Sequence, residues 1–142
     1  MMTIHKGTCQ ICGRSQKLPG GVLSKHGYTT RWGFFEKVCP GSGHLPFEVS
    51  ADMIERCRDS AAASAVEARQ QAAQYRAGKL DDRLRNSRYY ACNEKDRAEM
   101  LRRARETNAE CLDQHAAKLE DYVRRQNDLL ANWAPAPLKE VT

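Results

Sequence analysis

The feature that most constrains this chain is the segment GTCQICG, which holds a Cys9-x-x-Cys12 pair between two glycines. Two thiolates at this spacing, in a tight turn, can bind one metal ion. Three further ligand candidates, His26, Cys39 and His44, follow within the next 32 residues. Structural zinc sites take four ligands, so the pattern predicts a structural Zn²⁺ bound by four of these five residues.

The fourth ligand is left open by the sequence. Cys9, Cys12 and Cys39 supply three sulfur ligands, and either His26 or His44 completes the set. His44 would pair locally with Cys39 across a Pro-Gly-Ser-Gly turn, whereas His26 would attach a glycine-rich hairpin to the metal. Two alternatives are an open catalytic zinc position and cysteines without a metal; no H-E-x-x-H motif accompanies the site.

Glycine and proline mark out the domains. They cluster between residues 6 and 49, and beyond residue 50 only Gly78, Pro135 and Pro137 remain. This change predicts a zinc module over residues 1–50, a helical arm over 51–134 and a flexible tail over 135–142. Mixed short runs on both sides of the Pro-Gly-Gly turn predict a β-ribbon beside the metal.

Two long helices are predicted in the arm. The first begins at Ser50, an N-cap residue, and continues to Gly78; its apolar face is a line of alanines at helical spacing, Ala61, Ala65, Ala68 and Ala72. The second runs from Asn93 towards Pro135. Residues spaced seven apart predict its packing seam: Leu101, Asn108, His115, Tyr122 and Leu129.

The expected fold class is therefore mostly α. A small N-terminal zinc-finger module with a β-ribbon precedes a long antiparallel, coiled-coil-like helical hairpin. The sequence leaves residues 79–92 open, as an extension of a neighbouring helix or as a third, shorter helix. Thin alanine seams also suggest self-association into a homo-oligomer.

Basic residues gather near the expected turn of the hairpin. Residues 76–105 hold ten Lys or Arg against five Asp or Glu, whereas residues 106–142 hold four against seven. The candidate binding residues there are Arg83, Arg85, Arg88, Tyr89, Tyr90, Arg97, Arg102, Arg103 and Arg105. Such a tip would contact phosphates or an acidic protein surface; the alternative is a solvated face with local ion pairs.

A second candidate binding segment lies in the zinc module. The stretch HGYTTRWGFF mixes aromatic and basic residues, a composition that suits base stacking and phosphate contact. Lys25, Arg31 and Trp32 are the residues expected at such a surface. Alternatively, the aromatic rings form a small core over the metal.

Several functional classes are disfavoured by the sequence. It contains no glycine-rich phosphate loop, no G-x-S-x-G elbow and no paired-carboxylate motif, so we do not expect an enzyme. No apolar run approaches the roughly 20 residues of a membrane span, and no export signal precedes the cysteines. We expect a cytoplasmic protein with reduced cysteines and no membrane partner.

Three segments carry a family resemblance: KGTCQICGRSQKL, SKHGYTTRWGFF and CPGSGHLPFEVS. Together they resemble small zinc-finger proteins of bacteriophages and prophages, a likeness that covers about a third of the chain. The resemblance implies a phage or mobile-element origin, and with it a location in the host cytoplasm, but no activity. The acidic C-terminal stretch and the long alanine seam favour protein contacts, so we expect an accessory protein that binds a host or phage protein and modulates a host protein or defence complex. The alternative is a regulatory zinc-finger protein that binds DNA or RNA through the basic regions.

Overall fold

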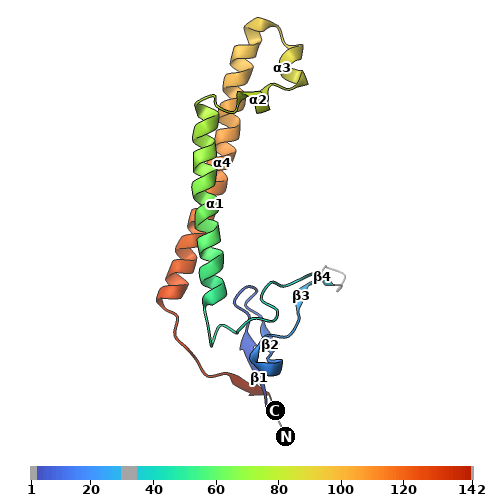
Figure 1. Cartoon of the computed structure of the whole chain (residues 1–142), viewed down its shortest axis with the longest axis vertical. Coiled ribbons are helices and arrows are strands. Elements are labelled where there is room, and N and C mark those ends of the chain that lie inside the picture. The colour runs from blue at the N-terminus through green and yellow to red at the C-terminus, as the bar shows by residue number, and fades with distance from the viewer. Residues whose placement is uncertain (1–2, 30–34, 142) are drawn as a thin grey trace. The chain divides into compact units, whose positions relative to one another are not determined.

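The computed structural model describes residues 3–29 and 35–141. It is mostly helical, with a small three-stranded antiparallel sheet at the N-terminus and a long helix towards the C-terminus (Figure 1). The chain divides into two compact units, Met1–Arg58 with Gln126–Thr142, and Asp59–Arg125. The first unit is thus larger than the expected module over residues 1–50 and includes a distant part of the chain.

The first unit is built on a sheet with the strand order β2-β1-β5. β1 (Ile4–Thr8) lies in the centre, antiparallel to β2 (Ser15–Lys17) and to β5 (Lys139–Val141). The register places Thr8 opposite Ser15 and Ile4 opposite Val141. The segment expected to be a flexible tail, 135–142, therefore contributes a strand, β5, to the first unit.

A β-ribbon is also present, but its strands differ from those expected. The Pro-Gly-Gly segment forms the short 3₁₀ helix η1 (Pro19–Gly21) and does not join paired strands. β3 (Gly27–Thr29) pairs instead with β4 (Phe35–Val38) in a separate two-stranded sheet. Leu18 and Leu23, on either side of η1, are both buried, so this turn folds two leucines into the core beside the cysteines.

α1 (Asp52–Arg76) has well-defined ends. At its start, the Ser50 hydroxyl accepts a hydrogen bond from the Asp52 N–H at 3.2 Å, as expected of an N-terminal capping residue. At its end, Gly78 has φ +78°, and the N–H groups of Gly78 and Lys79 bond to the carbonyls of Tyr75 and Gln74. This Schellman arrangement satisfies the last carbonyl groups of the helix and requires glycine.

The connecting segment that the sequence left open forms two short helices. These are α2 (Asp81–Leu84) and α3 (Ser87–Ala91), neither of which contains a buried residue. The Asn86 side chain caps α3 by accepting from the Tyr89 N–H. α4 (Glu94–Ala131) follows, and its first turn is anchored on the carbonyl of Asn93, close to the expected start.

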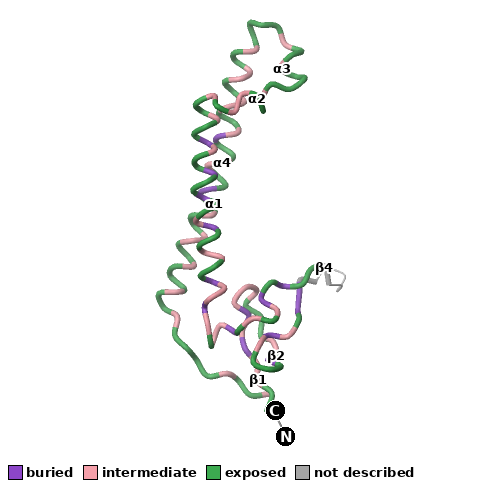
Figure 2. The backbone as a smooth tube through the Cα atoms, in the orientation of Figure 1, coloured by how far each residue is buried: buried purple, intermediate pink, exposed green. Residues whose placement is uncertain are grey.

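Alanines form the buried face of the helices in the second unit (Figure 2). All four predicted alanines of α1 are buried. On α4 the buried residues are Ala109 and Ala116, one position away from the predicted Asn108 and His115, and His115 is exposed. The predicted seam on α4 was therefore wrong by about one residue, because the closely packed side holds alanine and larger side chains flank it.

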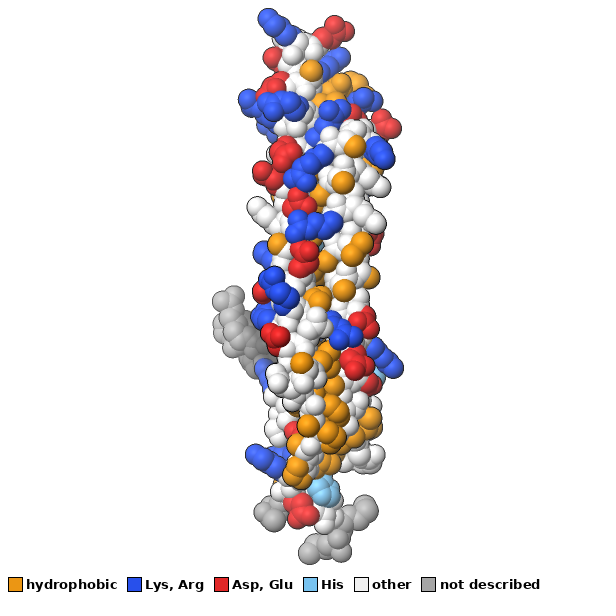
Figure 3. Space-filling view, turned by 90° about the vertical axis from the view of Figure 1, so that its left-hand side faces the viewer, with side chains coloured by type: hydrophobic (Ala, Val, Ile, Leu, Met, Phe, Trp, Pro, Cys, Tyr) orange, Lys and Arg blue, Asp and Glu red, His pale blue; other side chains and the backbone are white. Residues whose placement is uncertain are grey.

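Ion pairs join α1 to α4 in opposite order along the two helices. Arg69 pairs with Asp113 at 3.1 Å and Glu120 at 2.5 Å, whereas Arg76 pairs with Asp113 at 2.7 Å and Glu106 at 3.2 Å. The acidic partners are spaced by seven residues, which keeps them on one side of α4. Blue and red side chains alternate along the helices in Figure 3. These pairs fix the antiparallel register beside the alanines.

Candidate metal centre

The first two candidate ligands lie in one turn directly after β1. The Cys9 N–H donates to the Arg14 carbonyl at 2.9 Å, and the Gly13 N–H donates to the Cys9 carbonyl at 3.0 Å. Gly13 has φ +73°, a conformation that favours glycine. The Ile11 N–H also points to the Cys9 sulfur at 3.4 Å. The G-T-C-Q-I-C-G sequence therefore folds locally into a turn that presents both sulfurs on its inner side.

Cys39 approaches from the turn that follows β4. Its N–H donates to the His26 carbonyl at 2.7 Å, which fixes this turn against the segment before β3. Gly41 lies so close to the Cys9 sulfur that a Cβ at this position would overlap it. The Cys-Pro-Gly sequence thus allows the second turn to pack directly on the first.

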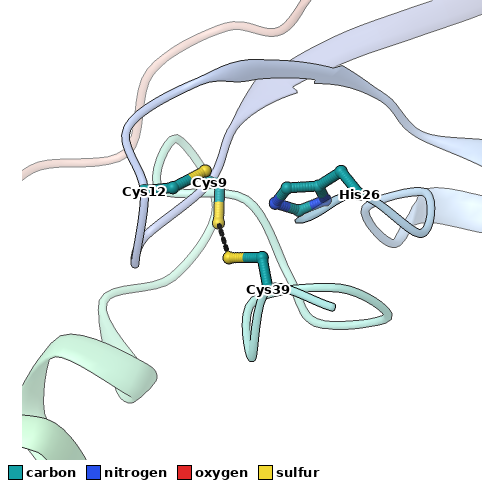
Figure 4. Close-up of side chains that lie close together, drawn as sticks. All are labelled: Cys9, Cys12, His26 and Cys39. Carbon is teal, nitrogen blue, oxygen red and sulfur yellow. Dashed lines mark hydrogen bonds between the residues drawn. The ribbon is translucent and has the colours of Figure 1, made fainter. Parts of the chain in front are cut away.

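His26 is oriented by its own surroundings. Its side chain is buried, with Nδ1 2.7 Å from the Ser24 carbonyl oxygen, so Nδ1 carries the proton and donates it there. The opposite nitrogen, Nε2, is buried, and none of the described residues offers it a hydrogen-bond partner. Figure 4 shows the imidazole beside the three thiols. A buried nitrogen with a free lone pair is costly unless it binds something, and a metal ion is such a partner.

These four side chains form a cluster suited to a metal ion. The ligand atoms of Cys9, Cys12, His26 and Cys39 all lie within 4.8 Å of one another. The sulfurs of Cys9 and Cys39 are 3.8 Å apart, well beyond the roughly 2.05 Å of a disulfide, and the cysteines are free thiols. Three of the four residues are buried and Cys12 is partly exposed, so an ion would be largely shielded from water.

No family model, curated protein or solved structure matches the chain. Functional interpretation therefore depends on the geometry of the chain itself.

The thiols have opposite pKa shifts. Burial alone would raise the pKa of Cys9, but hydrogen bonds from the backbone of Cys12 and Ile11 outweigh it and lower the pKa below its ordinary value. Burial, together with the neighbouring Cys9, raises the pKa of Cys39 to about 11. Cys9 is therefore the thiol prepared to bind as thiolate, and Cys39 must lose a proton when a cation arrives.

The fifth predicted ligand, His44, is not in the cluster. Its N–H donates to the Gly41 carbonyl at 3.2 Å, and its carbonyl accepts from the Leu23 N–H at 2.9 Å. Its backbone thus closes the turn after Cys39 while its side chain remains partly exposed. The cluster thus contains His26, which is more distant in sequence, and not His44, which would have formed a local ligand pair with Cys39.

The second candidate surface of the first unit is only partly described. Lys25 is exposed, one residue before His26. Arg31 and Trp32 lie outside the described residues.

The basic residues of the second unit are mostly engaged with neighbouring groups. Arg102 and Arg103 both pair with Glu99, at 2.6 and 2.9 Å. Arg105 pairs with Asp81, and Arg85 pairs with Asp82 at 3.2 Å. The alternative of a solvated face with local ion pairs therefore describes these arginines, and Glu99 has its pKa lowered to about 2 by Arg102 and Arg103.

Arg97 is held by two aromatic rings and two carbonyl groups. Its guanidinium donates to the carbonyls of Tyr90 and Cys92, and lies 5.6 and 5.8 Å from the ring centres of Tyr89 and Tyr90. The two rings pack edge to face at 5.1 Å. These three predicted binding residues thus form a local cluster that stabilises the join between α3 and α4. Arg83 and Arg88 are exposed.

Two contributors to the centre were missed from the sequence. Ser24 orients His26 through a backbone carbonyl, which leaves no side-chain signal in the sequence. Gln10, between two ligands, contacts the start of α1 and was not distinguished from an ordinary turn residue.

Within residues 3–29 and 35–141, no helix is both long and apolar enough to cross a bilayer.

Proposed function

We propose that Cys9, Cys12, His26 and Cys39 bind one structural Zn²⁺. The single observation that carries this proposal is the buried, unpartnered Nε2 of His26 beside three thiols. Three sulfurs and one imidazole nitrogen are the donor set of closed tetrahedral zinc sites. Sulfurs bound tetrahedrally at about 2.3 Å would lie about 3.8 Å apart, which agrees with the Cys9–Cys39 distance of 3.8 Å.

The zinc would contribute folding free energy directly. The core around the site is small and consists of Cys9, Leu18, Leu23 and Cys39, with a few partly buried neighbours. A unit with so little buried apolar surface depends on a cross-link, and a metal that joins the two turns supplies one. With four protein ligands, a tetrahedral zinc site would be closed and would leave no ligand position for catalysis.

Metal binding by two histidine variants tests the ligand assignment. We expect wild-type protein to bind one Co²⁺ or Zn²⁺ per chain, with thiolate-to-cobalt absorption in the near ultraviolet. His26→Ala should weaken metal affinity by at least about tenfold, whereas the matched control His44→Ala should change it less than about twofold. Equal effects of the two substitutions, or a wild-type protein without metal in native mass spectrometry, would refute the site.

For the whole protein we propose a non-enzymatic accessory role, in which the zinc module and a coiled-coil-like helical hairpin bind a host or phage protein. The resemblance of the module to phage and prophage zinc-finger proteins supports a phage origin and a host cytoplasmic location, and the acidic C-terminal stretch and the long alanine seam favour a protein partner. The second unit offers a shallow apolar groove with a polar edge, lined by Ala62, Ala65, Val66, Arg69, Gln70, Glu120 and Val123. Val66 remains 57% exposed there, so protein contacts would gain apolar burial.

Nucleic-acid binding is the second candidate function, favoured by the excess positive charge of residues 76–105. Within the described part of the chain, Arg83 and Arg88 are exposed and have no acidic partner, unlike Arg102 and Arg103. Any duplex binding should weaken with salt, with a log–log slope of about −0.9 per phosphate neutralised. Fluorescence anisotropy should then show a larger loss for Arg83→Ala/Arg88→Ala than for Arg102→Ala/Arg103→Ala; no binding at low salt would remove this candidate.

A further inference from the structure

Gln10 connects the metal-binding turn to α1. It lies between Cys9 and Cys12, and its side-chain oxygen accepts hydrogen bonds from the N–H groups of Met53 at 2.9 Å and Ile54 at 3.3 Å. The first N–H groups of a helix have no partner within the helix and need an acceptor from elsewhere. Here that acceptor comes from more than forty residues earlier in the chain.

The amide nitrogen of Gln10 completes this contact. It donates to the Leu45 carbonyl and to the Asp52 carboxylate, both at 2.9 Å. Asp52 also accepts from the Ser50 hydroxyl at 2.9 Å, and these bonds lower its pKa. Three of these four hydrogen bonds hold the Gln10 side chain against the first turn of α1, so the position of the Gln10 backbone matters to that turn.

The backbone position of Gln10 depends on its two neighbours. Cys9 and Cys12 belong to the metal cluster, and a bound ion would tie them to Cys39 and His26 from other turns. Without an ion, the Cys9-to-Cys12 turn is held by its own backbone hydrogen bonds and by the 3.8 Å contact between the sulfurs of Cys9 and Cys39, which are weaker links than metal–ligand bonds. The turn would then be free to loosen, and the side chain of Gln10 with it.

We infer that a metal ion bound at the cluster stabilises the first turn of α1 through Gln10. We call this coupling between the metal site and the start of α1 the latch. This inference rests on the proposed zinc site. Metal binding orders the Cys9-Gln10-Ile11-Cys12 turn, and the ordered turn caps residues 52–58. Loss of the metal would leave the first N–H groups of α1 without their acceptor and let the helix fray from this end.

Hydrogen exchange of the full chain tests the latch. The zinc-loaded wild type and Gln10→Ala are compared, with Gln16→Ala in β2 as the matched control, and zinc content is measured by native mass spectrometry in the same samples. In zinc-loaded Gln10→Ala, exchange in residues 53–58 should rise about fivefold, with zinc content and exchange near Ala72 and Ala109 unchanged. Gln16→Ala should exchange like wild type.

The two proposals fail in different ways in this experiment. If wild-type protein holds no zinc, the metal site itself is refuted. If Gln10→Ala holds one zinc and protects residues 53–58 as well as wild type does, the site stands and the latch is refuted. Removal of zinc from wild type by a chelator should raise exchange in residues 53–58, and unchanged exchange after demonstrated zinc loss would also overturn the latch.

Discussion

At the scale of single residues, the imidazole of His26 decides the ligand set. A sequence with two candidate histidines leaves the fourth ligand open, because both spacings suit a zinc site. The choice depends on the Ser24 carbonyl, which fixes the Nδ1 proton and frees Nε2 for a metal. Such backbone carbonyls are invisible in a sequence, whereas the cysteine types and the close Cys9–Cys12 spacing were sufficient to predict three members of the cluster.

Proton release upon metal binding should report on Cys39. Because its pKa is raised to about 11, this thiol is protonated at neutral pH without a metal and must lose that proton to become a ligand. We therefore expect at least one proton released per Zn²⁺ at pH 7, and an affinity that rises about tenfold per pH unit for each such proton. Isothermal titration calorimetry in two buffers of different ionisation enthalpy measures the number of protons released per Zn²⁺.

Two outcomes would contradict that assignment. A heat of binding that is the same in both buffers would mean that no proton is released. An unchanged proton count in Cys39→Ser, compared with the exposed control Cys111→Ser, would place the released proton elsewhere.

At the scale of elements, the helices show where periodicity is a sound guide. The four alanines predicted on α1 are buried, because helical spacing alone places them on one side. On α4 the seven-residue spacing predicted a seam through Asn108 and His115, yet the buried positions are Ala109 and Ala116. Close helix contact excludes large residues, so the smallest side chains, and not the most hydrophobic ones, mark the seam.

Overpacking of this seam should be destabilising. Ala72 has no exposed surface, so Ala72→Leu inserts a side chain where there is no space for it. We expect the free energy of unfolding to fall by about 1–3 kcal/mol. The adjacent Ala73 is exposed, and Ala73→Leu should change stability by less than about 0.5 kcal/mol. Urea unfolding of the zinc-loaded proteins, followed by circular dichroism, compares the two; equal stability would argue against close packing at Ala72.

At the scale of the whole molecule, the first unit is assembled from distant parts of the sequence. Leu138 packs on the core that contains Cys9 and Cys39, and the Trp133 indole donates to the Phe47 carbonyl at 2.6 Å. The Ala136 N–H likewise donates to the Glu48 carbonyl at 3.0 Å. From the sequence we expected a flexible tail here, since a short terminal segment with two prolines gives no sign that Lys139–Val141 pairs with β1.

Truncation of Leu138 tests this contribution. Because its side chain is only partly buried, Leu138→Ala should lower the unfolding free energy by about 1–2 kcal/mol, below the 2–5 kcal/mol of a fully buried leucine. Pro137→Ala, an exposed position next to it, is the control. Urea titration of the zinc-loaded proteins should show an earlier midpoint for Leu138→Ala alone. A midpoint equal to that of wild type would mean that the Leu138 side chain adds nothing to the core of the unit.

The pairing of β1 with β5 also sets the order of events while the chain is being made. β1 leaves the ribosome well before β5, because Val141, which lies opposite Ile4, follows it by more than 130 residues. The four residues of the candidate metal centre, Cys9, Cys12, His26 and Cys39, are also made long before that strand. During synthesis one edge of β1 therefore stays unpaired, and under the proposed zinc site an ion can be bound before the sheet is complete.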